Sequence, residues 1–317
     1  MFSQLFEIEG NPIPAGASVG HFVTADGIRL RHALFNRIKD KSKGTVIILN
    51  GRNECIEKYF ETIRDLNNHN FGVATFDWRG QGGSDRLIDD PHKGYVRSFN
   101  DYATDLEQFF SEIVLPDCRG PFFILAHSTG ALVALLAAPS LINRIQRMVF
   151  IAPLIELTEQ AFAQPTIKLL SGILRYTGFG KRYMVGSSRP RETQPFIGNK
   201  LTSDPDRYRR NSRLYEEHPL LGLGGPTITW VNAACRAMDA VANPDFQARI
   251  HIPTLIVAAG SDQVVSTAAI ERYVQRLRSG ALLTIDGARH EIIQEKDTFR
   301  EQFMAAFYAF VPGSVVD

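Results

Sequence analysis

The stretch "PFFILAHSTGALVALL", residues 121–136, decides how the rest of the sequence is interpreted. One apolar run stops at Ala126, and another starts directly after Gly130. A buried strand that turns sharply into a helix around one serine is typical of a nucleophile elbow, written G-x-S-x-G. Ala126 stands at the first glycine position, a departure of one methyl group where the residue only has to be small. The alternative is that Ser128 caps a helix beginning at Thr129.

Short apolar segments alternate with helical patterns on both sides of this stretch. A hairpin is expected around Asp26-Gly27. Further strands are expected at 45–50, 72–77, 122–126, 147–154, 252–262 and 281–286, and helices at 55–69, 99–114, 129–138, 266–280 and 298–311. The alternation predicts βαβ units, and strands that are apolar throughout are expected where helices cover both faces of a sheet. The sequence therefore predicts an α/β fold with a mostly parallel central sheet flanked by helices.

The alternation stops after about Leu157 and restarts at Ile252. Between them the chain is richer in Arg, Pro, Gly and aromatic residues, and it shows helical spacing at 161–182 and 227–241 without a clear strand. Insertions of this length at the rim of a sheet usually form lids over a substrate. We expect a core made of residues 1–157 and 251–317, and an inserted, mainly helical cap at residues 158–250.

The bulk properties exclude several classes of partner. The 317 residues carry a formal net charge of +1, which gives no electrostatic basis for binding nucleic acid. Cys55, Cys118 and Cys235 are widely separated, which indicates a reducing compartment. The first residues lack the basic and apolar regions of a signal peptide, and no apolar run is long enough to span a membrane. We expect a cytoplasmic protein, and peripheral contact with the inner face of the membrane stays open.

A nucleophilic serine needs a base and an acid that orients the base. In elbow-bearing α/β folds the chain order is serine, acid, histidine, and His290 is the only histidine after Asp262. Asp262 follows an apolar strand, at the end where ligand-facing residues collect. Glu156 is the alternative acid, whereas Asp286 is too close to His290 along the chain. The simpler alternatives are that Asp262 forms only a local turn and that His290 is a surface histidine.

An oxyanion hole needs two backbone N–H groups. One is expected from Thr129, directly after the elbow serine. The other is expected from Arg52 in the loop "NGRNE", where Gly51 permits a tight backbone. Glu54 and Lys58 could brace this loop through side-chain bonds, or they could be solvated charges at the start of a helix.

No metal or cofactor site is expected. The loop "DWRGQGGSD" fails as a dinucleotide fingerprint, because Asp85 stands where a glycine is required, and we expect Arg79 to pack beside the elbow. "HEIIQ" ends in Gln294, where the related zinc motif needs histidine. His127 is expected to be a structural side chain of the elbow rather than a second base.

Five segments together resemble the α/β-hydrolase superfamily, and within it the lysophospholipase L2 and monoacylglycerol lipase branch. They are "LNGRNECIEKY", "FDWRGQGGSDR", "LAHSTGA", "AAGSDQVV" and "DGARHEI". Asn50 stands where monoacylglycerol lipases usually have histidine, which favours the lysophospholipase L2 type. The resemblance implies an α/β-hydrolase fold, a cap over an acyl pocket, and no metal or organic cofactor. It assigns the nucleophile, acid, base and two oxyanion donors to Ser128, Asp262, His290, Arg52 and Thr129.

The resemblance implies a serine ester hydrolase whose small-molecule substrate is a lysophospholipid or a monoacylglycerol. Two alternatives stay open: a hydrolase of other small esters, thioesters or amides, peptidases included, and a non-catalytic binding protein on the same fold. The segment at 167–182 ends in Lys181 and Arg182 beside an apolar face. It would suit either a lipid interface or a helix packed over the pocket.

Overall fold

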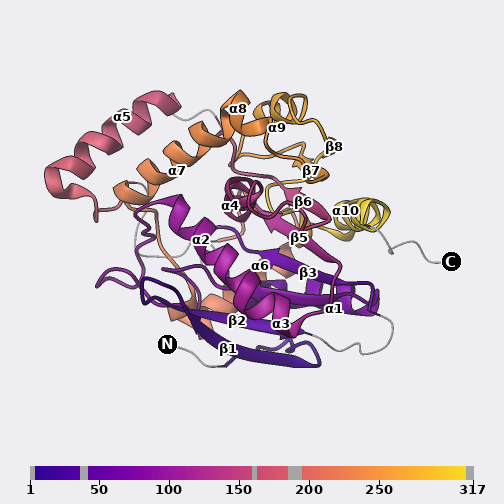
Figure 1. Cartoon of the computed structure of the whole chain (residues 1–317). Helices are drawn as coiled ribbons and strands as arrows, with labels where there is room; N and C mark the ends of the chain where they lie inside the picture. Colours follow the sequence, from indigo (N-terminus) through magenta and orange to yellow (C-terminus); the bar gives the residue numbers. More distant parts are fainter. Residues whose placement is uncertain (1–3, 36–41, 159–162, 185–194, 312–317) are drawn as a thin grey trace.

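The computed structural model of the chain describes residues 4–35, 42–158, 163–184 and 195–311. Within them, eight strands form one central sheet (Figure 1). The strands are β1 (Ala17–Val23), β2 (Arg29–Phe35), β3 (Thr45–Leu49), β4 (Gly72–Phe76), β5 (Phe122–His127), β6 (Arg147–Ile151), β7 (Thr254–Ala259) and β8 (Gly280–Ile285).

The strand order is β1-β2-β4-β3-β5-β6-β7-β8. β1 and β2 form the hairpin expected around Asp26-Gly27, and β2 pairs antiparallel with β4. All pairs from β4 to β8 are parallel, so the mostly parallel sheet is confirmed. From β3 the chain continues to β4 on one side and later to β5 on the other. Open α/β sheets bind ligands at such a switch point, outside the carboxyl ends of the strands.

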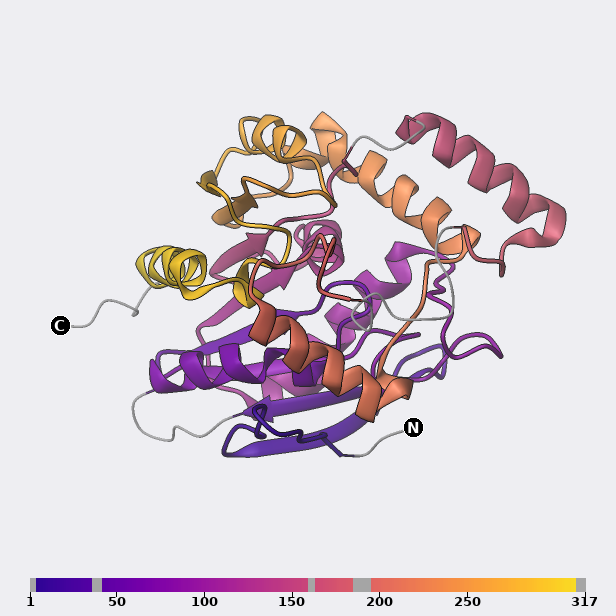
Figure 2. The same ribbon diagram turned by 180° about the vertical axis from the view of Figure 1, so that it is seen from behind.

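Helices cover both faces of the sheet. They are η1 (Ile56–Tyr59), α1 (Phe60–Asn68), α2 (Phe99–Phe109), η2 (Phe110–Val114), α3 (Leu115–Asp117), α4 (Thr129–Ala137), α9 (Thr267–Val274), η6 (Ile292–Gln294) and α10 (Asp297–Phe310). On one face α1 and α10 lie together, because His69 stacks on Tyr308 with ring centroids 3.9 Å apart and Arg300 pairs with Asp65 (Figure 2). On the other face α2 packs against α4.

The strand and helix that flank Ser128 are deeply buried. β3, β4 and β7 are buried at every residue, as expected for a sheet covered on both faces. Eight of the nine residues of α4 are buried, so this helix has no polar face. Full burial of each of Leu132, Val133 and Leu135 contributes about 1.5–3 kcal/mol. The core therefore holds the turn between β5 and α4 firmly in place.

The chain between β6 and β7 contains helices and no strand among its described residues. The helices are α5 (Gln164–Leu174), η3 (Arg175–Phe179), α6 (Pro205–Glu217), η5 (Pro219–Leu221), α7 (Ile228–Ala242) and α8 (Pro244–Gln247). α5 packs along α7, and α7 contacts α2 and α4 of the core (Figure 1). In the described parts of the chain, no helix combines the length and apolar character that crossing a membrane requires.

Helix α6 is not predicted by the sequence patterns, because seven of its thirteen residues are charged and few are apolar. Its start nevertheless carries a recognisable signal. The Asp204 carboxylate accepts hydrogen bonds from the N–H groups of Asp206 and Arg207, and Pro205 occupies the first helical position. The helix lies apart from α5 and α7, beside α1 (Figure 2).

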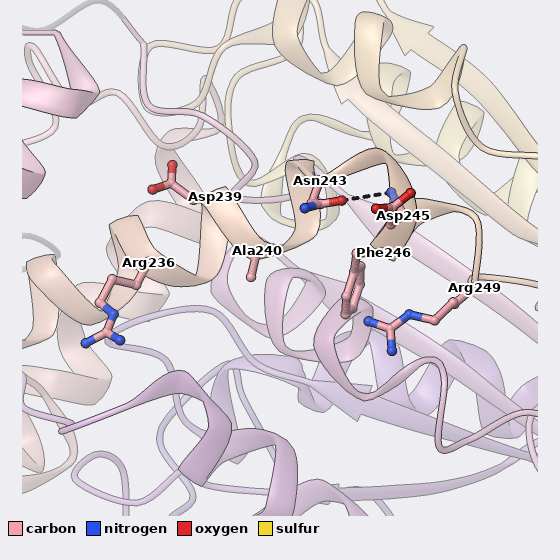
Figure 3. Close-up of a pocket in the computed structure, with 7 residues that line it drawn as sticks. All are labelled: Arg236, Asp239, Ala240, Asn243, Asp245, Phe246 and Arg249. Carbon is pink, nitrogen blue, oxygen red and sulfur yellow. Dashed lines mark hydrogen bonds between the residues drawn. The ribbon is translucent and has the colours of Figure 1, made fainter.

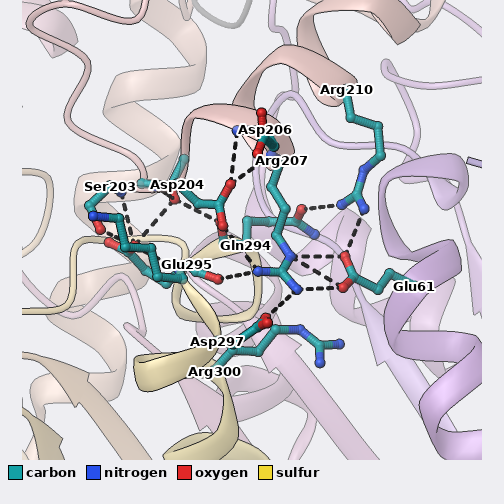
Figure 4. A network of polar contacts seen from close by, with 12 residues as sticks. Glu61, Ser203, Asp204, Asp206, Arg207, Arg210, Gln294, Glu295, Asp297 and Arg300 are labelled. Carbon is teal, nitrogen blue, oxygen red and sulfur yellow. Dashed lines mark hydrogen bonds and ion pairs between the residues drawn. The ribbon is translucent and has the colours of Figure 1, made fainter. Parts of the chain in front are cut away.

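Ion pairs hold α6 against the core (Figure 4). Arg207 pairs with Glu61 at 2.6 Å and with Asp297 at 2.7 Å, and Arg210 pairs with Glu61 at 2.7 Å. Burial raises the pKa of Glu61, but its bonds from Arg207 and the charge of Arg210 outweigh this and lower the pKa to about 2. The insertion therefore contacts the core at two separate places, and its role as one cap stays a prediction.

Candidate active site

Ser128 lies in a strained turn between β5 and α4. Its backbone has φ 50° and ψ −110°, a conformation that costs a residue other than glycine about 1–3 kcal/mol. The Ser128 side chain forms no capping bond to α4, so the helix-cap alternative is wrong. A strained serine at a strand-to-helix turn is the geometry of a nucleophile elbow.

The two small residues of the elbow have different surroundings. A methyl group on Gly130 would lie 2.6 Å from the carbonyl oxygen of Asn50 and closer still to that of Leu49, so this position needs glycine. Ala126 pairs with Leu49 on β3 and with Phe150 on β6, and its methyl group is buried. The departure from G-x-S-x-G is therefore accommodated within the sheet.

Ser128, His290 and Asp262 form one hydrogen-bonded chain. His290 Nε2 lies 3.1 Å from Ser128 Oγ, and His290 Nδ1 lies 2.8 Å from Asp262 Oδ2. A carboxylate only accepts hydrogen bonds, so we assign the imidazole proton to Nδ1, which leaves Nε2 able to accept the serine proton. All three residues are buried or nearly so.

Asp262 also forms the local turn considered as its alternative. Its Oδ1 accepts bonds from the N–H groups of Val264 (2.7 Å) and Val265 (3.0 Å), and its Oδ2 faces His290. Burial raises the pKa of Asp262, but the charge and hydrogen bond of His290 outweigh this, and the pKa lies below its usual value. Glu156, in contrast, is half exposed and lies 3.7 Å from Arg272, so the structure does not bring it to the base.

The loop "NGRNE" (50–54), named the oxyanion loop below after its predicted role, is held by side chains of the core and of the insertion. The Gln81 amide donates to the carbonyl oxygens of Gly51 (2.9 Å) and Glu54 (3.1 Å). Asn53 has φ 62°, and its carbonyl oxygen accepts a bond from Tyr215 at 2.9 Å. Gln81 and Tyr215 were missed by sequence reasoning. Gln81 lies in the loop "DWRGQGGSD", but nothing there indicated that its side chain reaches residues 51 and 54, and Tyr215 belongs to no motif.

Arg52 connects this loop to α7. Its guanidinium donates to the carbonyl oxygen of Gly224 at 2.9 Å and lies 5.9 Å from the centre of the Trp230 ring. The N–H of Thr129, as the first of α4, has no carbonyl one turn earlier to bond. The backbone N–H groups of Arg52 and Thr129 stay the predicted oxyanion donors.

Arg79 does not occupy the place expected for it beside the elbow. Its guanidinium forms ion pairs with Asp26 of the β1–β2 hairpin and with Asp105 of α2. Within its loop, Trp78 and Gln81 contact the oxyanion loop instead, through bonds to the carbonyl oxygens of Asn50 and Gly51. Arg79 therefore secures the hairpin to α2.

A buried charged cluster, formed by Glu54, Lys58, Tyr59, His127 and Glu291, lies behind the oxyanion loop. Glu54 Oε2 accepts bonds from the Gly51 N–H and from the Tyr59 hydroxyl (2.6 Å). Lys58 Nζ lies 3.1 Å from Glu54 and 2.7 Å from Glu291. Glu54 and Lys58 therefore brace the loop, and the solvated alternative is wrong. Tyr59 and Glu291 were missed. Tyr59 falls on the apolar face of the helix expected at 55–69, but nothing linked its hydroxyl to Glu54, and nothing in the sequence pattern indicates that Glu291 is buried.

Gly51 is required by the approach of two of these side chains. A methyl group there would lie 2.8 Å from Glu54 Oε2 and 2.8 Å from His127 Nδ1. His127 contacts Glu54 and the backbone of His290, which fits its expected structural place in the elbow.

One surface groove, of about 680 Å³, lies elsewhere (Figure 3). It is lined by residues of α7, α8 and their surroundings, namely Arg236, Asp239, Ala240, Asn243, Asp245, Phe246 and Arg249. None of the candidate catalytic residues lines it, so we do not assign it to the site.

Comparison with known proteins identifies the family. The family model described as "Hydrolase_4: Serine aminopeptidase, S33" matches residues 40–297. Lysophospholipase L2 of Escherichia coli K12 is 33% identical over 299 residues, which cover 91% of this chain and 86% of that protein. A probable lysophospholipase L2 of Haemophilus influenzae is 29% identical over 267 residues, covering 84% and 83%.

Solved structures show the same fold. A soluble variant of the monoglyceride lipase of Saccharomyces cerevisiae, in complex with a substrate analogue, superposes with a TM-score of 0.74 at 18% identity and covers 100% of both chains. A thermostable carboxyl esterase of Bacillus coagulans superposes with a TM-score of 0.74 at 20% identity, covering 95% and 99%. The predicted α/β-hydrolase fold is confirmed. The chain belongs to the α/β-hydrolase family described as serine aminopeptidase S33, and it is a carboxylic ester hydrolase.

Proposed function

We propose that this ester hydrolase works through an acyl-enzyme on Ser128. As Ser128 Oγ bonds to the ester carbonyl carbon, His290 Nε2 takes the serine proton and the carbonyl electrons move onto oxygen. The N–H groups of Arg52 and Thr129 stabilise that oxyanion. The carbon–oxygen bond to the leaving alcohol then breaks, and His290 gives the alcohol its proton. Asp262 keeps the imidazole oriented and stabilises its charged form.

Water completes the cycle in the same way. His290 removes one proton from water, the resulting hydroxide attacks the acyl carbon, and Ser128 leaves with the proton from His290. The observation that supports this mechanism best is the chain of hydrogen bonds from Asp262 through His290 to Ser128, with the serine on a strained turn. A chain built for binding alone has no need of this alignment.

For the substrate, we propose an ester with one fatty acyl chain, a lysophospholipid or a monoacylglycerol. Relatives at 33% and 29% identity are named lysophospholipase L2 and probable lysophospholipase L2, and a relative at 23% identity is named monoglyceride lipase. Asn50 in place of the usual histidine favours the lysophospholipase. The family description also names aminopeptidases, so amino-acid amides are the competing substrate class.

We propose that residues 158–250 form a cap with two different parts. α7 packs on α2 and α4, and its Trp230 lies against Phe99 and beside Arg52, so this part covers the site. α6 is tied to α1 through Glu61 and serves as the anchor. α5 packs on α7 and forms the outer surface.

The outer surface of α5 and η3 is suited to a lipid surface. Leu169, Ile173, Tyr176 and Phe179 are exposed by 66%, 53%, 93% and 44%. Lys181 and Arg182 follow them in the sequence, and such basic residues attract anionic lipids. We propose that this surface docks on a membrane to take up its substrate.

The docking proposal is tested with vesicles that contain anionic lipid. Replacing Leu169 and Tyr176 by serine should lower partitioning roughly a hundredfold, since two buried apolar side chains at about 1.5 kcal/mol each contribute about 3 kcal/mol together. Leu115→Ser, at a leucine exposed to 47% on α3, is the matched control. Equal partitioning of all three proteins would refute docking through α5.

The enzymatic proposal is tested by kinetics on two substrate panels. Ser128→Ala should abolish hydrolysis of nitrophenyl acyl esters while the circular dichroism spectrum stays unchanged. Wild-type protein should prefer long-chain lysophospholipids and monoacylglycerols over acetyl esters and amino-acid amides. Full esterase activity in Ser128→Ala would refute the mechanism, and a preference for amides would refute the lipid substrate.

A further inference from the structure

The buried charged cluster reaches all three parts of the proposed machinery. Glu54 holds the backbone of Gly51 in the oxyanion loop. His127 immediately precedes the elbow serine, and Lys58 pairs with Glu291, which immediately follows the base His290. The five side chains of the cluster are almost fully shielded from water. Their protonation states therefore have structural consequences.

His127 has an acceptor opposite each of its ring nitrogens. Nδ1 lies 3.2 Å from the Glu54 carboxylate, and Nε2 lies 3.2 Å from the carbonyl oxygen of His290. A carbonyl oxygen cannot donate, and the Glu54 carboxylate already accepts from Gly51, Tyr59 and Lys58. A neutral imidazole carries one proton, so it would leave one nitrogen lone pair facing an oxygen lone pair.

The charge balance of the cluster also disfavours a neutral His127. The cluster contains two buried carboxylates, Glu54 and Glu291, and one ammonium, Lys58. An unbalanced charge in a site this dry is costly, and a cationic His127 makes the cluster neutral. The ring of His127 also lies near the ring of His290, with ring centroids 4.9 Å apart.

We propose that His127 is an imidazolium and a positioning residue, which ties the oxyanion loop to the loop of the catalytic base. One N–H reaches Glu54, the side chain that holds Gly51, and the other reaches the backbone of His290. The cation therefore sets the spacing between the oxyanion donors and the base on either side of Ser128. The kinetic consequences rest on the proposed acyl-enzyme mechanism, whereas the protonation state does not.

The surroundings of His127 determine the direction in which its pKa shifts. Burial lowers the pKa of His127, but the charge and hydrogen bond of Glu54 and the charge of Glu291 outweigh burial and the opposing charge of Lys58, so the pKa lies above its usual value. Because folding raises the pKa of His127, the stability that its protonation contributes is fully present below the pKa of the unfolded state. This stability is lost as the pH rises through the pKa of the folded state. The connection that His127 makes between Glu54 and the backbone of His290 should therefore be lost as the pH becomes alkaline.

The direct test is nitrogen NMR of protein labelled at histidine with ¹⁵N. We expect one histidine with protons on both ring nitrogens at neutral pH, lost from the spectrum of His127→Gln and retained in that of His251→Gln, an exposed control. Glu291→Gln should lower the pKa of this histidine, which provides the assignment if His127→Gln fails to fold. A singly protonated His127 at neutral pH would overturn the proposal.

The kinetic test separates positioning from mere folding. His127→Gln can bridge only one of the two partners through its amide N–H, and we expect kcat to fall by up to about a hundredfold with little change in KM. Wild-type kcat should decline at alkaline pH, and His127→Gln should lack that decline. An alkaline decline that persists unchanged in a folded His127→Gln would overturn the positioning role. Loss of the mechanism at Ser128 would leave the NMR result intact, so the two failures are distinguishable.

Discussion

Gly130→Ala adds a single methyl group at the point where α4 passes β3. That methyl would lie 2.6 Å from the Asn50 carbonyl oxygen and closer to that of Leu49, against an ordinary contact of 3.4 Å or more. Both obstacles are backbone atoms, so either α4 or the start of the oxyanion loop must move by nearly 1 Å. Misplacement of about 1 Å costs roughly a hundredfold in rate, and overpacking costs about 1–3 kcal/mol in stability.

The assay compares kcat/KM on a nitrophenyl acyl ester and the urea midpoint of Gly130→Ala with those of Gly172→Ala. Gly172 lies within α5, where the same methyl would meet only Asn232 Nδ2, at 3.4 Å. Alanine is a better helix former than glycine, so Gly172→Ala should raise the free energy of unfolding by about 0.5–1 kcal/mol and leave the activity unchanged. If Gly130→Ala keeps kcat within about twofold of the wild-type value, the steric account of the elbow is refuted.

Three further predictions concern charged side chains. Asp262→Asn should lower kcat by about 10⁴ without unfolding, because an amide no longer fixes the tautomer of His290; near-normal turnover would contradict this. Lys58→Met should lose about 3–5 kcal/mol in urea denaturation, because it leaves two buried carboxylates without their ammonium, and an unchanged midpoint would show that the cluster is not critical. Glu61→Gln should lower the free energy of unfolding by about 2–3 kcal/mol at pH 7. Because the folded pKa of Glu61 is depressed, its contribution is present above pH 4.5 and lost towards pH 2, so the difference between the two proteins should shrink at pH 3, and a constant difference would refute the assignment.

The central part of the fold was predictable because its residues obey local rules. β3, β4 and β7 are short apolar strands, and α4 is an apolar helix, so both element types follow from the pattern. The elbow at Ser128 was predictable because a strand, a turn and a helix meet within ten residues. Chain order then left His290 as the only candidate base after Asp262.

The remaining features depend on distant contacts. α6 is stabilised by Glu61 and Asp297, which lie far away in the sequence, and its own sequence has too few apolar residues to indicate that it packs on the core. Glu291 belongs to a buried pair only because Lys58 faces it across the fold. Arg79 was misplaced for the same reason, since its partners come from the hairpin and from α2.

The most direct test of the central claim is covalent trapping of the nucleophile. Native protein is treated with an alkyl fluorophosphonate, and intact mass and peptide mapping locate the adduct. We expect one adduct per chain on Ser128, none in Ser128→Ala, and labelling of His290→Ala slower by about a thousandfold or more. A folded wild-type protein that hydrolyses acyl esters but forms no adduct, or forms it on another residue, would contradict the proposed mechanism.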